Sequence, residues 1–169
     1  RADKVLEQVF PLGKSPVIEV DYQDGKKPTV VAESGHIVSY LIRHFDKEGK
    51  LTPSDEAGKE EEECLLHFSE ASIQPLLTFV IVLAISSKQA PFFLRPVITL
   101  FANGIRDSFL QPEIVKVADF LESKLAEAKK TGDLYFIDNK LTGAEAMLHF
   151  NISLILKSSR LPNFNGAKY

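Results

Sequence analysis

The stretch PTVVAESGHIVSYLIRHF, from Pro28 to Phe45, decides the fold of the N-terminal part of the chain. The β-branched run that ends at Ala32 is typical of a strand. From Ser34 onward the apolar residues follow the spacing of one helical face, so the sequence predicts a helix that begins there. A carboxylate, a hydroxyl and a glycine stand at this joint, in the order Glu33-Ser34-Gly35.

The joint can be interpreted in two ways. A serine at the start of a helix is commonly a plain cap, whose side chain pairs with a free backbone N–H. A helix N-terminus also offers unpaired N–H groups and a partial positive charge to an anionic ligand. Ser34 could then donate to a ligand carboxylate, and Glu33 could accept from an ammonium group. The joint alone favours the cap, and the alternative is a site for the zwitterionic end of an amino acid.

Upstream of the joint, Val17–Tyr22 is rich in β-branched residues and predicts a first strand. Asp24-Gly25 predicts the turn of a hairpin, and 29–32 predicts the returning strand. Residues 2–9 predict a short helix. The segment Lys14-Ser15-Pro16 before the first strand is compatible with a cis bond at Pro16, which would leave the backbone of Ser15 free to pair with an extended peptide. The alternative is a rigid turn.

Downstream, residues 46–59 are polar, contain two glycines and a proline, and predict a linker. Helices are predicted over 60–86, with a kink at Pro75, and over 96–110. A third is predicted from Pro112 onward, with an apolar stripe of Ile114, Ala118, Leu121 and Leu125. Thr142-Gly143-Ala144-Glu145 is a capping box, and it opens an apolar helix over 146–156 that we expect in the middle of a bundle. The order predicts an α+β chain, with a small hairpin unit followed by an all-helical unit.

Composition narrows the class of protein further. The 169 residues are 44% hydrophobic and 25% charged, which is ordinary for a soluble globular protein, and a net charge of −3 argues against nucleic acid as a partner. The single cysteine, Cys64, excludes an intramolecular disulfide and fits a reducing compartment. No secretory signal is present in residues 1–10, and the longest apolar window, 76–85, is too short to span a membrane. The histidines have no metal-binding register with cysteine, so no metal is expected.

Four motifs occur in an order that resembles the cytosolic glutathione S-transferase superfamily, closest to the fungal and bacterial transferases. They are FPLGKSP (10–16), VAESG (31–35), HFSEAS (67–72) and LTGAE (141–145). The likeness runs from about residue 1 to residue 150. It implies a thioredoxin-like N-terminal domain, over residues 1–46 and incomplete, followed by an all-α C-terminal domain over 47–169. It also implies a cytoplasmic detoxification enzyme that works as a homodimer.

The resemblance also implies roles for particular residues. Glu33 and Ser34 would hold the γ-glutamyl end of glutathione, and Ser15, before cis-Pro16, would pair by its backbone with the cysteinyl part. Lys14 would lie near the glycyl carboxylate. A small hydrophobic electrophile would bind between the domains, near His67, Phe68 and the helix from Pro96. The implied reaction conjugates the glutathione thiol to that electrophile or reduces a peroxide with it.

Two departures from the family's pattern qualify these roles. The family's first strand and helix, which supply the hydroxyl beside the glutathione sulfur, have no counterpart in this sequence, so the chain is expected to be a fragment and its catalytic residue cannot be named. Glu145 stands where the family's capping box usually has aspartate. The competing hypothesis is a non-catalytic dimerisation or scaffold module with the same fold. A third is an unrelated α+β domain, which predicts a trans bond at Pro16.

Overall fold

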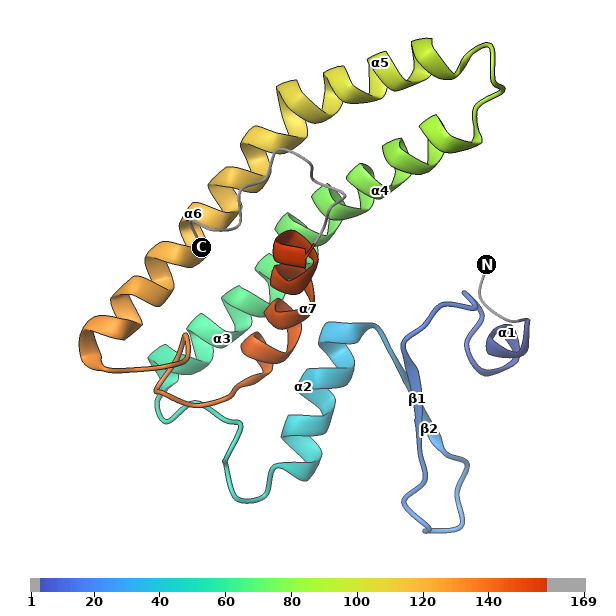
Figure 1. The fold of residues 1–169 in the computed structure, drawn as a ribbon. Helices are drawn as coiled ribbons and strands as arrows, with labels where there is room; N and C mark the ends of the chain where they lie inside the picture. Colours follow the sequence, from blue (N-terminus) through green and yellow to red (C-terminus); the bar gives the residue numbers. More distant parts are fainter. Residues whose placement is uncertain (1–3, 158–169) are drawn as a thin grey trace.

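A computed structural model describes residues 4–157 of the chain. Short α1 (Val5–Val9) precedes a hairpin of β1 (Val17–Val20) and β2 (Thr29–Ala32), and then α2 (Ser34–Phe45). The helical part contains α3 (Glu56–Phe68), η1 (Ser69–Ile73), α4 (Gln74–Gln89), α5 (Arg95–Ile105), η2 (Arg106–Leu110), α6 (Gln111–Thr131) and α7 (Gly143–Lys157). In Figure 1 the hairpin and α2 lie beside two long helical rods, and α7 packs against α2 and α3.

The hairpin and the joint follow the sequence closely. β1 and β2 are antiparallel, in a register that pairs Val17 with Ala32 and Val20 with Thr29. The helix begins at Ser34, as predicted. Asp46 ends it by accepting hydrogen bonds from the amides of Lys50 and Leu51, both at 2.9 Å. The domain boundary expected near residue 46 stays a prediction.

The two rods correct the predicted helix boundaries. The first runs without interruption from Glu56 to Gln89, so the linker is shorter than predicted. The second runs from Arg95 to Thr131, although two separate helices were predicted there. Each rod contains a π-helical segment that ends two residues before an internal proline: η1 ends before Pro75 and η2 before Pro112. A proline ring clashes with the carbonyl four residues earlier, and a π turn widens the helix at that point. The widened turn lets each rod continue past its proline.

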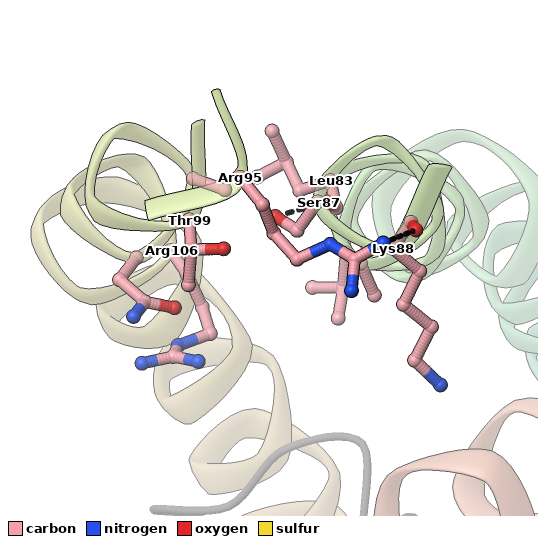
Figure 2. A pocket seen from close by; sticks show the side chains of 10 residues that line it. Leu83, Ser87, Lys88, Arg95, Thr99 and Arg106 are labelled. Atoms are coloured by element: carbon pink, nitrogen blue, oxygen red, sulfur yellow. Dashed lines mark hydrogen bonds between the residues drawn. The ribbon is translucent and has the colours of Figure 1, made fainter. Parts of the chain in front are cut away.

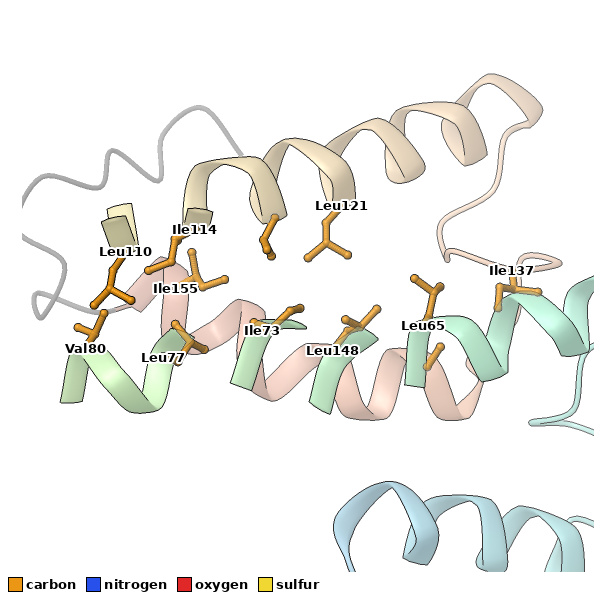
Figure 3. Packing of buried hydrophobic residues seen from close by; sticks show 12 residues of the cluster. Leu65, Ile73, Leu77, Val80, Leu110, Ile114, Leu121, Ile137, Leu148 and Ile155 are labelled. Atoms are coloured by element: carbon orange, nitrogen blue, oxygen red, sulfur yellow. The ribbon is translucent and has the colours of Figure 1, made fainter. Parts of the chain in front are cut away.

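The hydrophobic core lies between the rods and α7 (Figure 3). Leu65, Leu110 and Leu148 are fully buried in it. The stripe predicted on α6 is confirmed, since Ile114, Ala118 and Leu121 are buried, and Leu125 is partly buried. The expectation for α7 was too broad: Ala144, Leu148 and Ile155 are buried, but Phe150 is 59% exposed. Packing from the rods covers one face of α7, and the apolar composition gave no indication of which face that is.

The capping box at the start of α7 forms with a modified bond pattern. Glu145 reaches back to the amide of Thr142 at 2.8 Å, as predicted. The Thr142 hydroxyl accepts from the amide of Ala144 at 3.3 Å and donates to Glu145 at 2.5 Å, whereas in the usual capping box this hydroxyl accepts from the amide of the third residue after it, here Glu145. Glu145 also accepts from the amide of Phe136 at 2.8 Å, so it anchors the preceding loop as well.

A second carboxylate, Glu62 on α3, accepts a 2.8 Å hydrogen bond from the amide of Gly143. Burial raises the pKa of Glu62, the bond from Gly143 opposes that rise, and repulsion from Glu145 adds to it. A carboxyl group whose pKa is higher in the folded state binds more protons there than in the unfolded chain. Its contribution to stability is therefore greatest at low pH and is lost as the pH rises through the folded-state pKa.

We therefore expect Glu62→Gln to gain melting temperature relative to the unmodified protein as the pH rises from about 4 to about 7, because glutamine keeps an acceptor for Gly143 and cannot ionise. Thermal unfolding followed by circular dichroism at both pH values measures this difference. A difference in melting temperature that stays constant across the range would contradict the assignment.

The first rod also meets a length and composition test for a membrane helix. An 18-residue window within Glu56–Gln89 has a mean hydropathy of 1.8, and 22% of it is buried. The core helix of a soluble protein can pass the same test. The absence of a membrane span stays a prediction.

Candidate functional site

A hollow of about 630 Å³ lies where the hairpin, α2, η1 and α7 meet. Ser15 and Pro16 line it from the loop before β1, and Glu33 and Ser34 line it from the joint after β2. The opposite wall consists of Ser69, Glu70, Gln74, Ala146, Met147, Phe150 and Asn151. The hollow is therefore lined by the segments before β1 and after β2 and by residues from the helical part.

The strand register explains why two sequence motifs meet here. Val17 pairs with Ala32, so the residue before Val17 and the residue after Ala32 lie at the same end of the hairpin. These are Pro16 and Glu33. The Ser15–Pro16 peptide bond is cis, which contradicts the trans bond of the unrelated-domain alternative. Lys14 is exposed and precedes Ser15, but it is not among the residues that line the hollow.

Glu33 has an unusual backbone for a residue with a side chain. Its φ is 69° and its ψ is 126°, and its side chain makes no hydrogen bond that would cap α2. Non-glycine residues with positive φ are uncommon and occur often at functional sites. Glu33 is exposed, and within residues 4–157 its carboxylate has no hydrogen bond or ion pair. It is available to a ligand in the hollow.

Ser34 does not serve as a conventional cap either. Its hydroxyl donates to Glu70 Oε1 at 2.8 Å, and the amide of Gly35 donates to the same oxygen at 2.9 Å. A carboxylate from η1 thus occupies the start of α2, where its charge is stabilised by the helix dipole. Glu70 was not predicted as a site residue, although it lies inside the HFSEAS motif that carries part of the resemblance.

Two predicted residues lie outside this hollow. His67 is exposed, and its Nε2 is 3.8 Å from Glu63 Oε1. The ring of Phe68 packs against Phe120 with centroids 4.9 Å apart, at the edge of the core. Their predicted contact with a hydrophobic ligand stays a prediction. Met147 and Phe150, read from the sequence as part of an apolar core helix, line the hollow instead.

A separate groove lies between α4 and α5, about 370 Å³ in volume (Figure 2). Val80, Leu83 and Ala102 are among its apolar residues. Arg95 extends across it and donates to the carbonyl of Lys88 at 3.2 Å. Arg106 belongs to the same rod as Arg95, and its Nε is 2.8 Å from Asp107 Oδ1. The groove is lined by residues of the helix from Pro96, which was predicted to lie near the hydrophobic ligand, but not by His67 or Phe68.

No cluster of three or more histidine, cysteine, aspartate or glutamate side chains that could hold a metal occurs between residues 4 and 157. The lining of the first hollow offers hydroxyl, amide and carboxylate groups.

The sequence is similar to two yeast proteins. It is 30% identical over 155 residues to glutathione S-transferase 1 of Saccharomyces cerevisiae, which covers 91% of this chain and 64% of that protein. It is 33% identical over 152 residues to glutathione S-transferase 3 of Schizosaccharomyces pombe, covering 90% of this chain and 58% of that protein. The chain thus spans less than two thirds of the length of either relative. No family model matches the chain.

Solved structures share the fold. Glutathione S-transferase 1-6 from Anopheles dirus species B aligns with a TM-score of 0.68 at 23% identity, over 98% of this chain and 69% of that one. Ure2p5 from Phanerochaete chrysosporium, cocrystallised with 1-(S-glutathionyl)-2,4-dinitrobenzene, aligns with a TM-score of 0.66 at 23% identity, over 99% and 69%. These alignments confirm the predicted fold class, in which a thioredoxin-like part precedes an all-α part.

Proposed function

We propose that the chain belongs to the glutathione S-transferase superfamily, which its similarity to the two yeast proteins over most of its length supports. We propose further that the hollow between the hairpin and η1 is its glutathione-binding site. The observation that carries the proposal is the meeting of Ser15, Glu33 and Ser34 in one hollow. The sequence separates these residues, and neither a plain cap nor a rigid turn requires them to face the same space.

Each of these residues has a distinct role in the proposal. Glu33, which has no partner among the described residues, accepts from the ammonium of the γ-glutamyl group. The backbone amide of Ser34, at the start of α2, donates to the α-carboxylate of the same γ-glutamyl group. The backbone of Ser15, an exposed residue, pairs with the cysteinyl part, as an added strand would. Lys14 lies near the glycyl carboxylate, one residue beyond the hollow's lining.

The proposed reaction is conjugation. The glutathione thiolate attacks the electrophilic carbon of a small hydrophobic compound, a sulfur–carbon bond forms, and the leaving group departs with its electron pair. A free thiol has a pKa of about 8.5, so the reaction needs a group that favours the thiolate. No residue of this chain is assigned to that task. Peroxide reduction by the same thiol is the second form of the proposal, with a cytoplasmic role in detoxification for either form.

Two measurements on the same preparation test the proposal. We expect the folded chain to be retained on immobilised glutathione and eluted by free glutathione. Turnover of glutathione with 1-chloro-2,4-dinitrobenzene, or with a hydroperoxide, then separates a catalytic protein from one that only binds. Folded protein that passes through the glutathione matrix would refute the binding site and favour the scaffold alternative.

An exposed apolar surface supports the proposal of a homodimer. Phe79, Val82 and Ile85 on α4, residues 92–94 in the connection, and Val97, Leu100 and Phe101 on α5 are all 40% or more exposed. They lie on the α4–α5 arm that extends from the bundle in Figure 1. Contiguous apolar surface of this kind usually marks an interface. We propose that a second copy of the chain covers it.

We expect Phe101→Asp to convert the dimer to a monomer, because a charge in an apolar interface loses its hydration without gaining a partner. Sedimentation velocity over a range of protein concentrations measures the change. Leu134→Asp is the matched control, since Leu134 is 82% exposed but lies in the loop before α7. A Phe101→Asp protein with unaltered dimer dissociation would show that this surface is not the interface.

A further inference from the structure

Glu70 occupies a position that the proposed glutathione site does not yet explain. Its Oε1 accepts the hydroxyl proton of Ser34 and the amide proton of Gly35, at 2.8 and 2.9 Å. A hydroxyl has one proton to donate. While this bond lasts, Ser34 can offer a ligand only its oxygen lone pairs and its own backbone amide. Ser34 therefore faces the hollow mainly as an acceptor, contrary to the expectation that it donates its hydroxyl to a ligand carboxylate.

Other acceptors in the same hollow lack a donor. In the described part of the chain, Glu70 Oε2 and the Glu33 carboxylate make no hydrogen bond. Asn151 is only 2% exposed; its Nδ2 donates to the carbonyl and the hydroxyl of Ser69 at 3.1 and 2.9 Å. Its Oδ1 is buried and has no partner. Buried acceptors are nearly always paired, so an unpaired one beside a hollow indicates a missing donor.

The charges of the hollow also favour a ligand that donates hydrogen bonds. Its lining contains two carboxylates, Glu33 and Glu70, and no lysine, arginine or histidine. Two negative charges attract an ammonium group and repel a carboxylate, and the partial positive charge at the start of α2 offsets only part of that repulsion. A zwitterionic ligand end would therefore gain more from its ammonium than from its carboxylate.

On the basis of the proposed function, we infer that Glu70 is a specificity-determining residue of the site, which receives the free α-ammonium of the γ-glutamyl group together with Glu33. Glu70 Oε1 holds the Ser34 hydroxyl in its accepting orientation, and Oε2 accepts from the ammonium. The ligand's α-carboxylate is restricted to the remaining amide at the start of α2. The site thus selects a γ-glutamyl group whose amine is unmodified.

Two tripeptide analogues separate the ammonium from the carboxylate. Glutaryl-Cys-Gly lacks the ammonium, and 4-aminobutyryl-Cys-Gly lacks the α-carboxylate. We expect the unmodified protein to bind the second at least about tenfold more tightly than the first, in calorimetric titrations, because a charge-assisted bond to a desolvated ammonium is the stronger contact. This comparison needs no substitution and does not depend on how a variant folds.

Glu70→Gln then assigns the preference to this residue. The glutamine oxygen can still accept from Ser34 and Gly35, so the fold should be retained, but the charge near the ammonium is gone. We expect the preference between the two analogues to shrink about tenfold, with weaker binding of glutathione itself. Glu63→Gln is the control, because Glu63 lies about two turns earlier on the same rod, is exposed, and does not line this hollow.

The outcomes are distinguishable. If the unmodified protein binds neither glutathione nor either analogue, the proposed function fails and this inference fails with it. If it binds glutathione but Glu70→Gln leaves the analogue preference unchanged, only the inference is refuted. If Glu70→Gln binds glutathione more tightly, Glu70 occupies the position that the ligand's carboxylate would take. That result would also refute the assignment of Glu70 to the ammonium.

Discussion

Replacing Glu145 with alanine should lower the free energy of unfolding by about 3 kcal/mol, and the melting temperature by about 10 °C. The Glu145 carboxylate accepts from the amides of Thr142 and Phe136, both at 2.8 Å, and from the Thr142 hydroxyl. Alanine would leave both amides without their acceptor, at the point where α7 enters the core. Unfolding in guanidinium, followed by circular dichroism, measures the loss.

Two further variants make this prediction specific. Glu145→Asp should cost about 1 kcal/mol, since the shorter carboxylate can still reach the Thr142 amide but gives up Phe136. Glu122→Ala, on the exposed side of α6, should stay within about 0.5 kcal/mol of the unmodified protein. Equal stabilities for Glu145→Ala and Glu122→Ala would show that the box contributes little to the fold.

Replacing Glu33 with alanine should weaken glutathione binding about thirtyfold and leave stability nearly unchanged. A charge-assisted bond to an ammonium contributes roughly 2 kcal/mol, which corresponds to this factor. Within the described residues the Glu33 side chain has no hydrogen bond or ion pair whose loss would destabilise the fold. Alanine would adopt the same backbone φ of 69° as glutamate, so the substitution adds no backbone strain. Calorimetric titration with glutathione and thermal unfolding measure the two effects.

Glu19→Gln is the matched control for Glu33. It removes a carboxylate from an exposed position of β1, outside the lining of the hollow, so binding should be unaltered. If Glu33→Ala and Glu19→Gln weakened binding equally, the cause would be the overall charge of the hairpin. If Glu33→Ala left affinity unchanged, the ammonium site would lie elsewhere.

Local patterns in the sequence were sufficient for the hairpin and the start of α2. Two β-branched runs and a positive-φ glycine predicted the antiparallel pair, and the change of period at Ser34 located the helix. The meeting of Ser15 with Glu33 and Ser34 came from the family resemblance. The strand register explains this meeting, because it places Pro16 and Glu33 at the same end of the hairpin.

The residues of the opposite wall of the hollow could not be predicted from local sequence patterns, because tertiary packing determines which side chains lie there. Glu70 was inside a recognised motif, but nothing in the spacing showed that its carboxylate would reach the start of a helix 35 residues earlier. The apolar composition of α7 predicted burial without direction, so Met147 and Phe150 were assigned to the core. The distinction between an apolar residue in a core and one beside a hollow depends on neighbours that are distant in sequence.

The π turns before the two prolines have a consequence for how these rods tolerate change in length. Leu65, Ser69, Ile73 and Leu77 are all buried at intervals of four, although each such step rotates about 40° around an ordinary α-helix. Unwinding at η1 cancels this drift and keeps the four side chains on one line. Deleting or inserting a single residue between α3 and α4 would turn every later position by about 100° and carry Leu77 and Val80 out of the core. Insertions and deletions among related sequences should therefore fall in the loops at the rod ends, and not near Pro75 or Pro112.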